Sequence, residues 1–173
     1  METIEYNGEI YSRRNAKWTD SRNLVVHEML QRFLNQLYLE QLDYSKYTIN
    51  DLVAEGDKFK DSSSYQSAII FYEKALVDCD EVTYKYILPR ITSCYRKNNM
   101  PRKVIDLFSE TKRKYGTDFI TPVLLTSVAA AYCDLNEYEN ALRCCKWAYK
   151  KFGGFNPNLS NVYTRIKKES GLE

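Results

Sequence analysis

The sequence predicts an all-α protein, an α-α superhelix of about three helical hairpins with a C-terminal capping helix, preceded by a small β-hairpin and one long helix. Two observations predict this fold. Aromatic residues recur at Phe59, Tyr95 and Tyr132, which lie 36 and 37 residues apart, and a fixed period of this length is typical of helical repeat proteins. Only six glycines and four prolines occur among 173 residues, so most of the chain is expected to be ordered.

The β-rich head is predicted over residues 1–19. Two short stretches with strand character flank Asn7-Gly8, and this dipeptide is the strongest short-range signal of a β-hairpin. A third short strand is expected at Lys17–Thr19, after a turn at Asn15-Ala16. Such a small sheet needs a helix to pack against.

The long helix is predicted within residues 20–47, capped by Asp20-Ser21 and ending near Asp43. Apolar residues from Leu30 to Leu42 recur at steps of three and four, so one face of the helix is apolar. We expect this face to cover the head and the first hairpin. A dimerisation seam is the alternative.

Residues 48–155 are predicted to form three hairpins, at about 49–82, 85–118 and 122–155. In each, a small residue follows the recurring aromatic by nine positions, at Ala68, Val104 and Ala141. A small side chain there lets the two helices approach closely. Pro89 falls in the first helix of the second hairpin, so that helix is expected to kink or to begin late.

The last segment, residues 156–173, is predicted to be a capping helix after Gly153-Gly154, with Leu159 and Ile166 on its apolar side. All of these segments are expected to form one structural unit.

The hairpin pattern resembles the tetratricopeptide repeat. The resemblance covers about residues 49–155, and the second copy departs from it at Val104, Pro89 and Thr111. The whole chain also resembles bacterial tetratricopeptide proteins with a short β-rich head. The resemblance implies a non-catalytic scaffold that binds a peptide or protein segment in a concave groove. The positions implied to line this groove for a partner are Asp57, Tyr86, Arg90, Ser93, Arg96, Lys97, Thr126, Ser127 and Ala130.

One known mode of partner recognition is excluded by the groove residues. Members of the family that grip the C-terminal carboxylate of chaperones use lysine, asparagine and arginine at five positions. Those positions here hold Val53, Asp57, Arg90, Val123 and Ser127, so the carboxylate clamp is absent.

Charge is unevenly distributed along the chain, although the formal net charge is only +2. Residues 49–82 contain eight acidic and three basic residues, whereas residues 83–117 contain two acidic and nine basic residues. We therefore expect Arg90, Arg96 and Lys97, with Arg102 and Lys103 of the next helix, to form a basic patch that contacts an acidic or C-terminal segment of a protein partner.

Enzymatic chemistry is not predicted, because no nucleophile–base pair, phosphate-binding glycine loop or metal-ligand set is visible. The five cysteines form no CxxC pair, and His27 is the sole histidine, so neither a metal nor a cofactor is expected. The adjacent Cys144 and Cys145 diverge by about 100° on a helix and are expected to be core residues.

Two alternative functions stay open at this stage. Residues 93–115 also resemble a pentatricopeptide repeat, which implies RNA binding, but the acidic first copy argues against a nucleic acid partner. Self-association of acidic and basic copies is the other alternative, and a homodimer is possible without being indicated. No membrane span or signal peptide is visible, so we expect a cytoplasmic protein.

Overall fold

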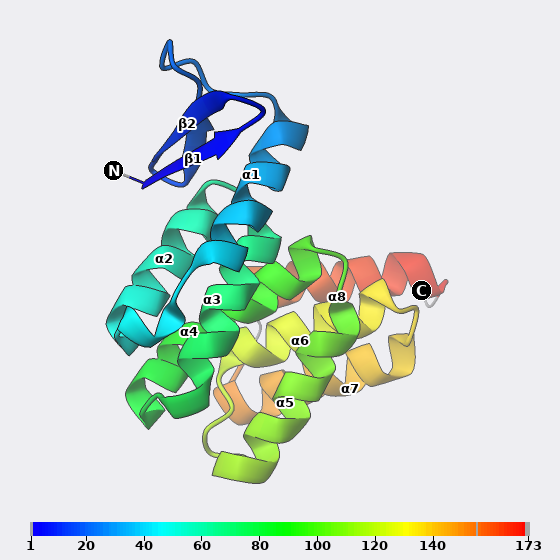
Figure 1. The fold of residues 1–173 in the computed structure, drawn as a ribbon. Coiled ribbons are helices and arrows are strands. Elements are labelled where there is room, and N and C mark those ends of the chain that lie inside the picture. Colours follow the sequence, from blue (N-terminus) through cyan, green and yellow to red (C-terminus); the bar gives the residue numbers. More distant parts are fainter. Residues whose placement is uncertain (1, 155, 172–173) are drawn as a thin grey trace. The chain divides into compact units, whose positions relative to one another are not determined.

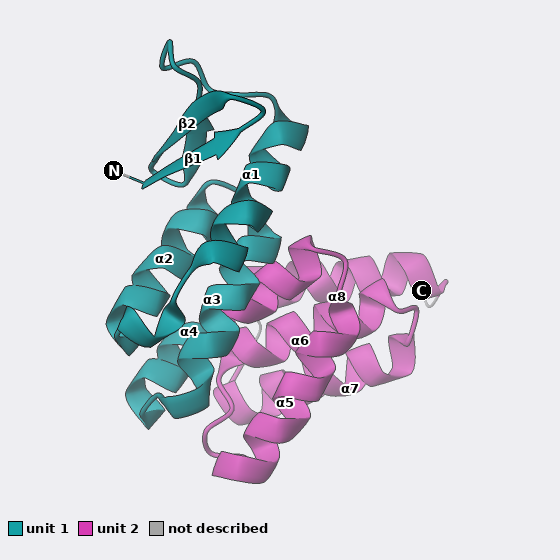
Figure 2. Cartoon of the chain, in the orientation of Figure 1, with its two compact units in different colours: residues 1–87 teal, residues 88–173 magenta. Residues whose placement is uncertain are grey.

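A computed structural model describes residues 2–154 and 156–171 of the chain (Figure 1). The described residues form eight α-helices, one short 3-10 helix and a three-stranded sheet at the N-terminal side. The predicted fold class, helical hairpins behind a small β-rich head, is therefore confirmed. The chain divides into two compact units, residues 1–87 and 88–173, with the boundary inside helix α4 (Figure 2). The single structural unit stays a prediction.

The β-rich head has the predicted strands, which are β1 (Glu2–Tyr6), β2 (Glu9–Arg14) and β3 (Lys17–Thr19), antiparallel in the order β1-β2-β3. The connections follow from turn chemistry, since Asn7 and Gly8 have φ values of 53° and 77°. Glu2 lies opposite Arg13, and Arg13 lies opposite Trp18. These three side chains therefore share the inner face of the sheet.

Helix α1 (Glu28–Gln41) covers this inner face, as predicted, but it begins later than the sequence indicated. The predicted cap is wrong because the Asp20 carboxylate accepts the backbone N–H groups of Arg22 and Leu24 and so stabilises a loop. His27 caps the helix instead, with Nδ1 accepting from the Leu30 N–H. The Trp18 indole donates to Asn35 of α1 over 2.9 Å and fixes the sheet on the helix.

A buried arginine attaches the head to the first hairpin. The side chain of Arg13 is 3% exposed, and its guanidinium lies 4.5 Å and 4.2 Å from the ring centroids of Tyr38 and Phe59. It donates to Glu2 over 2.5 Å and to Glu55 over 3.1 Å. Burial opposes ionisation of Glu2, but hydrogen bonds from Tyr38 and Arg13 outweigh it and lower the pKa of Glu2.

The remaining helices alternate as hairpins behind a 3-10 turn at Tyr44–Lys46. They are α2 (Ile49–Asp61), α3 (Tyr65–Asp78), α4 (Glu81–Lys97), α5 (Pro101–Tyr115), α6 (Pro122–Asp134), α7 (Tyr138–Phe152) and α8 (Pro157–Ser170). Helix α2 packs on α3 in unit 1, and α6 packs on α5, α7 and α8 in unit 2. The small residues Ala68, Val104 and Ala141 are fully buried, which lets the helices approach closely.

Helix α4 differs from the prediction for the second copy. It begins at Glu81, and Pro89 lies in its interior. Of the two expected outcomes, the late start is wrong and the kink stays a prediction. Pro89 removes one backbone donor, which costs about 3 kcal/mol in a helix interior. Burial of Leu88, Ile91 and Cys94 on the same helix offsets this cost, because a buried aliphatic side chain contributes about 1.5–3 kcal/mol.

Helix α8 ends the described part of the chain and packs against α6 and α7, where Leu159 and Ile166 are buried. Asn156 caps it by accepting the Leu159 N–H over 2.9 Å, and Pro157 occupies its first turn.

Candidate protein-binding site

Two of the predicted groove residues, Asp57 and Tyr86, belong to unit 1 and contact each other. The Tyr86 hydroxyl donates to one carboxylate oxygen of Asp57 over 2.9 Å, and the Tyr72 hydroxyl donates to the other over 2.6 Å. Tyr86 is exposed and Asp57 is half-buried. The two hydroxyls hold the carboxylate of Asp57 in one orientation, so this end of α2 presents an ordered, hydrogen-bonded acid.

In unit 2, Arg96 is engaged in an ion-pair network that the sequence did not predict. Its Nε donates to Asp134 of α6 over 2.8 Å, and Arg165 of α8 donates to the same carboxylate over 2.5 Å. Arg165 also binds Glu169 over 2.8 Å. Two arginines and two carboxylates from three helices therefore balance each other.

The electrostatics of Asp134 follow from this network. Partial burial opposes its ionisation, but the hydrogen bonds from Arg96 and Arg165 outweigh the burial and lower the pKa of Asp134. Asp134 is thus a stable anion at neutral pH, and Arg96 is already paired with it.

The predicted basic patch is consequently less positive than its sequence composition indicated. Arg102 forms a second ion pair, 2.8 Å from Glu137. Two of the five cations in the predicted patch, Arg96 and Arg102, are thus neutralised by carboxylates within unit 2. The sequence did not reveal either pairing, because Asp134 is 38 residues from Arg96 along the chain and Glu137 lies just before α7, far from Arg102 in sequence.

The other predicted residues of unit 2 differ in accessibility. Ser93 and Lys97 are exposed on α4, whereas Arg90 is half-buried. On α6, Thr126 and Ser127 are half-buried and retain accessible surface. Ala130 is only 1% exposed, so its prediction as a lining residue is corrected: its side chain belongs to the core of unit 2.

Three buried thiols are poorly suited to nucleophilic chemistry. Burial raises the pKa of Cys144 to about 12, and burial also raises the pKa of Cys145 to about 11. Burial and a hydrogen bond to Glu169 raise the pKa of Cys133 to about 11. These thiols are therefore protonated at neutral pH, whereas nucleophilic attack requires a thiolate. Within residues 2–154 and 156–171, no group of three or more histidine, cysteine or acidic side chains could hold a metal ion.

Comparison with known proteins gives a relationship of fold. The crystal structure of the Sgt2 TPR domain from Aspergillus fumigatus superposes with a TM-score of 0.58 at 17% sequence identity, covering 71% of this chain and 79% of that one. The fold is thus similar to that of a tetratricopeptide repeat domain. No family model matches the sequence, and no curated protein sequence matches it. None of the described helices has the length and apolar character needed to span a membrane.

Proposed function

We propose that this protein is a non-catalytic scaffold that binds a peptide or a segment of another protein on the first helices of its hairpins. The observation that supports this proposal is the fold, which is similar to that of the Sgt2 TPR domain. A hairpin array presents a row of helices to a partner, and such rows serve as extended binding surfaces.

The accessible side chains of unit 2 support a hydrogen-bonding rather than a strongly basic face. Ser93 of α4 and the pair Thr126 and Ser127 of α6 are small and uncharged, and Arg96 is paired with Asp134. Small side chains leave room for a peptide backbone, and hydroxyl groups can both donate and accept hydrogen bonds. We therefore propose that the partner segment is recognised through its backbone and an uncharged side chain.

A reducing compartment such as the cytoplasm is part of the same proposal. All five cysteines are free, and four of them are buried. Free, buried thiols are usual for proteins of reducing compartments, whereas disulfides prevail in oxidising ones.

A matched pair of substitutions tests the proposed face. Ser93→Trp places a large side chain on the exposed side of α4, and Ser109→Trp makes the same change on the exposed side of α5. Wild type and both variants, checked for helicity by circular dichroism, are used to capture proteins from a lysate of the native host. We expect a partner that wild type and Ser109→Trp retain and Ser93→Trp loses, as quantified by mass spectrometry.

Two results would contradict the proposal. Recovery of the same proteins with all three baits would show that α4 is not the binding face. An eluate dominated by RNA, lost after ribonuclease treatment, would favour the alternative function of an RNA-binding repeat protein.

A further inference from the structure

Side chains of α5 and α7 meet in unit 2. Trp147 of α7 packs edge-on against Phe108 of α5, with ring centroids 5.9 Å apart. The ammonium of Lys112 on α5 lies 5.5 Å from the centroid of the Trp147 ring. Lys151, on the next turn of α7, donates to the backbone carbonyl of Thr117 in the loop after α5. The two helix ends therefore form one continuous surface.

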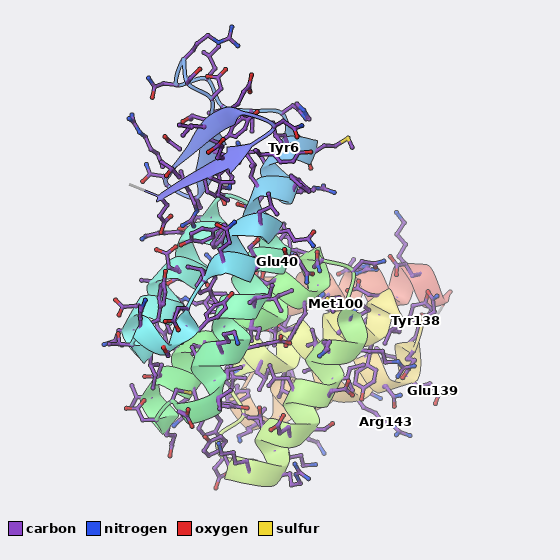
Figure 3. All side chains as sticks on the ribbon, in the orientation of Figure 1. Tyr6, Glu40, Met100, Tyr138, Glu139 and Arg143 are labelled. Carbon is purple, nitrogen blue, oxygen red and sulfur yellow. The ribbon has the colours of Figure 1, made fainter. Side chains whose placement is uncertain are left out.

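Exposed cations gather on this surface around the half-buried Trp147. We name it the α5–α7 surface, and it consists of Lys112, Arg113, Arg143, Lys146, Trp147 and Lys150. The three cations on α7 are spaced by three and four residues, so they form one stripe along the helix. Figure 3 shows the side chain of Arg143, at the start of this stripe, extending away from α7. The nearest acids along these helices are Glu110 and Glu139, about one turn before the cations.

Four of the five cations on this surface are not used internally, and Lys112 is the exception because it contacts Trp147. Arg96, Arg102 and Arg165 are each paired with a carboxylate. By contrast, Arg113, Arg143, Lys146 and Lys150 form no ion pair, hydrogen bond or ring contact with any residue that the structure describes.

Helix stability alone does not explain the cations. A positive charge in the last turn of a helix interacts favourably with the helix dipole, and this accounts for Arg113 and Lys150. Arg143 and Lys146 lie in the middle of α7, beyond the reach of that effect. Arg143 follows Glu139 by four residues, which is a favourable spacing, but Lys146 and Lys150 lie one turn apart and repel each other. An anion outside the chain would therefore stabilise this end of the stripe.

We propose that the α5–α7 surface binds an acidic segment of a protein partner, with Trp147 as its apolar anchor. Arg143 and Lys150 are about 10 Å apart along the helix axis. Acidic side chains at alternate positions of an extended segment are about 7 Å apart and point the same way. Two such carboxylates therefore fit within the span from Arg143 to Lys150. This surface is separate from the face of α4 and α6 in the proposed function.

The geometry of Trp147 favours a protein segment over single-stranded nucleic acid. Binding of nucleic acid strands depends on exposed aromatic faces on which bases stack. The face of Trp147 carries the ammonium of Lys112, and its ring is packed against Phe108. Affinity for nucleic acid also depends on many phosphate contacts, whereas this surface has five cations with two carboxylates at its edge.

A binding measurement with defined probes tests the proposal on the full chain. The probe is a fluorescein-labelled extended peptide of alternating aspartate and serine, about eight residues long so that it spans the surface, and its binding is followed by fluorescence anisotropy at low salt. The test variant is Lys146→Glu/Lys150→Glu. The matched control is Lys167→Glu/Lys168→Glu, which changes the charge equally on exposed residues of α8.

We expect the test variant to bind the peptide about tenfold more weakly than wild type or worse, because two attractive contacts become repulsive, and the control to stay within about twofold. Equal losses in both variants would show a general effect of net charge and overturn the proposal, as would unchanged binding by the test variant. Oligouridine that binds more tightly than the peptide and is lost in the same variant would assign the surface to nucleic acid instead. Peptide binding that persists in Ser93→Trp separates this surface from the proposed function.

Discussion

The two units of the chain carry opposite charge and use their cations differently. Residues 1–87 contain 15 acidic and 10 basic residues, a net charge of −5, whereas residues 88–173 contain 15 basic and 8 acidic residues, a net charge of +7. In unit 1, Arg13 is buried between two aromatic rings and two carboxylates. In unit 2, the cations of the α5–α7 surface face solvent. Pairing with a carboxylate of the same unit therefore distinguishes a cation that holds the fold from one that is available for a partner.

The largest loss of stability is expected when the buried cation of unit 1 is removed. Arg13→Ala leaves the carboxylate of Glu55 buried beside Lys58 alone, and breaking a buried pair costs about 3–5 kcal/mol. We expect this loss in the free energy of unfolding measured by urea denaturation. Arg14→Ala removes the same side chain from an exposed neighbouring position and is expected to change stability by at most about 0.5 kcal/mol. Equal effects of the two variants would refute the role assigned to Arg13.

The second test concerns the ion-pair network of unit 2, whose contribution to stability should depend on pH. The pKa of Asp134 is lowered in the folded state, so its ionisation stabilises the fold above its ordinary pKa, and this contribution is lost as the pH falls through the lowered value. Asp134→Asn is expected to cost about 1.5–3 kcal/mol at neutral pH, since hydrogen bonds to a charged group are lost.

The difference between wild type and Asp134→Asn should then shrink as the pH falls from neutral to about 3, below the ordinary pKa of an aspartate, because the stabilising contribution is lost in that direction. Urea denaturation of both proteins at the two pH values measures it. A difference independent of pH would mean that the arginines do not act through the charge of Asp134.

A smaller effect is expected at the close approach of α2 and α3 in unit 1. A Cβ atom at Gly56 would lie 2.6 Å from Cε1 of Tyr72, a fully buried residue. Gly56→Ala should therefore destabilise the protein by about 1–3 kcal/mol through overpacking. Helix propensity alone predicts a gain of about 0.5–1 kcal/mol, so the sign of the change in thermal or urea denaturation decides between the two effects.

Local chemistry made much of the fold predictable. The hairpin was predictable because its turn depends on two neighbouring residues, Asn7 and Gly8. The helices were predictable because aromatic residues recur at a regular period, at Phe59, Tyr95 and Tyr132. The start of α1 was mispredicted because an aspartate that caps a helix and one that stabilises a loop look identical in sequence. At Pro89, α4 continues although proline disfavours a helix interior, because burial of neighbouring side chains on the same helix offsets the cost.

The candidate site was less predictable than the fold. The resemblance selected helix positions but gave no information on their partners, so Arg96 was assigned to a basic patch although Asp134 neutralises it from 38 residues away. Ala130 was assigned to the groove although its methyl group is buried. Neither the pairing of Arg96 nor the burial of Ala130 was predictable, because both are set by helices that are distant in sequence. The groove itself stays a prediction.

The protonated, buried thiols have a practical consequence for spectroscopy. Maleimide reagents need access to a thiolate, and Cys94, Cys133, Cys144 and Cys145 are all buried. Burial also raises the pKa of Cys133, Cys144 and Cys145, which lowers their thiolate fraction further. With the half-buried Cys79 replaced by serine, a new cysteine on an exposed position such as Ser93 would take up a dye selectively. The protein is therefore suited to site-specific labelling without a cysteine-free background.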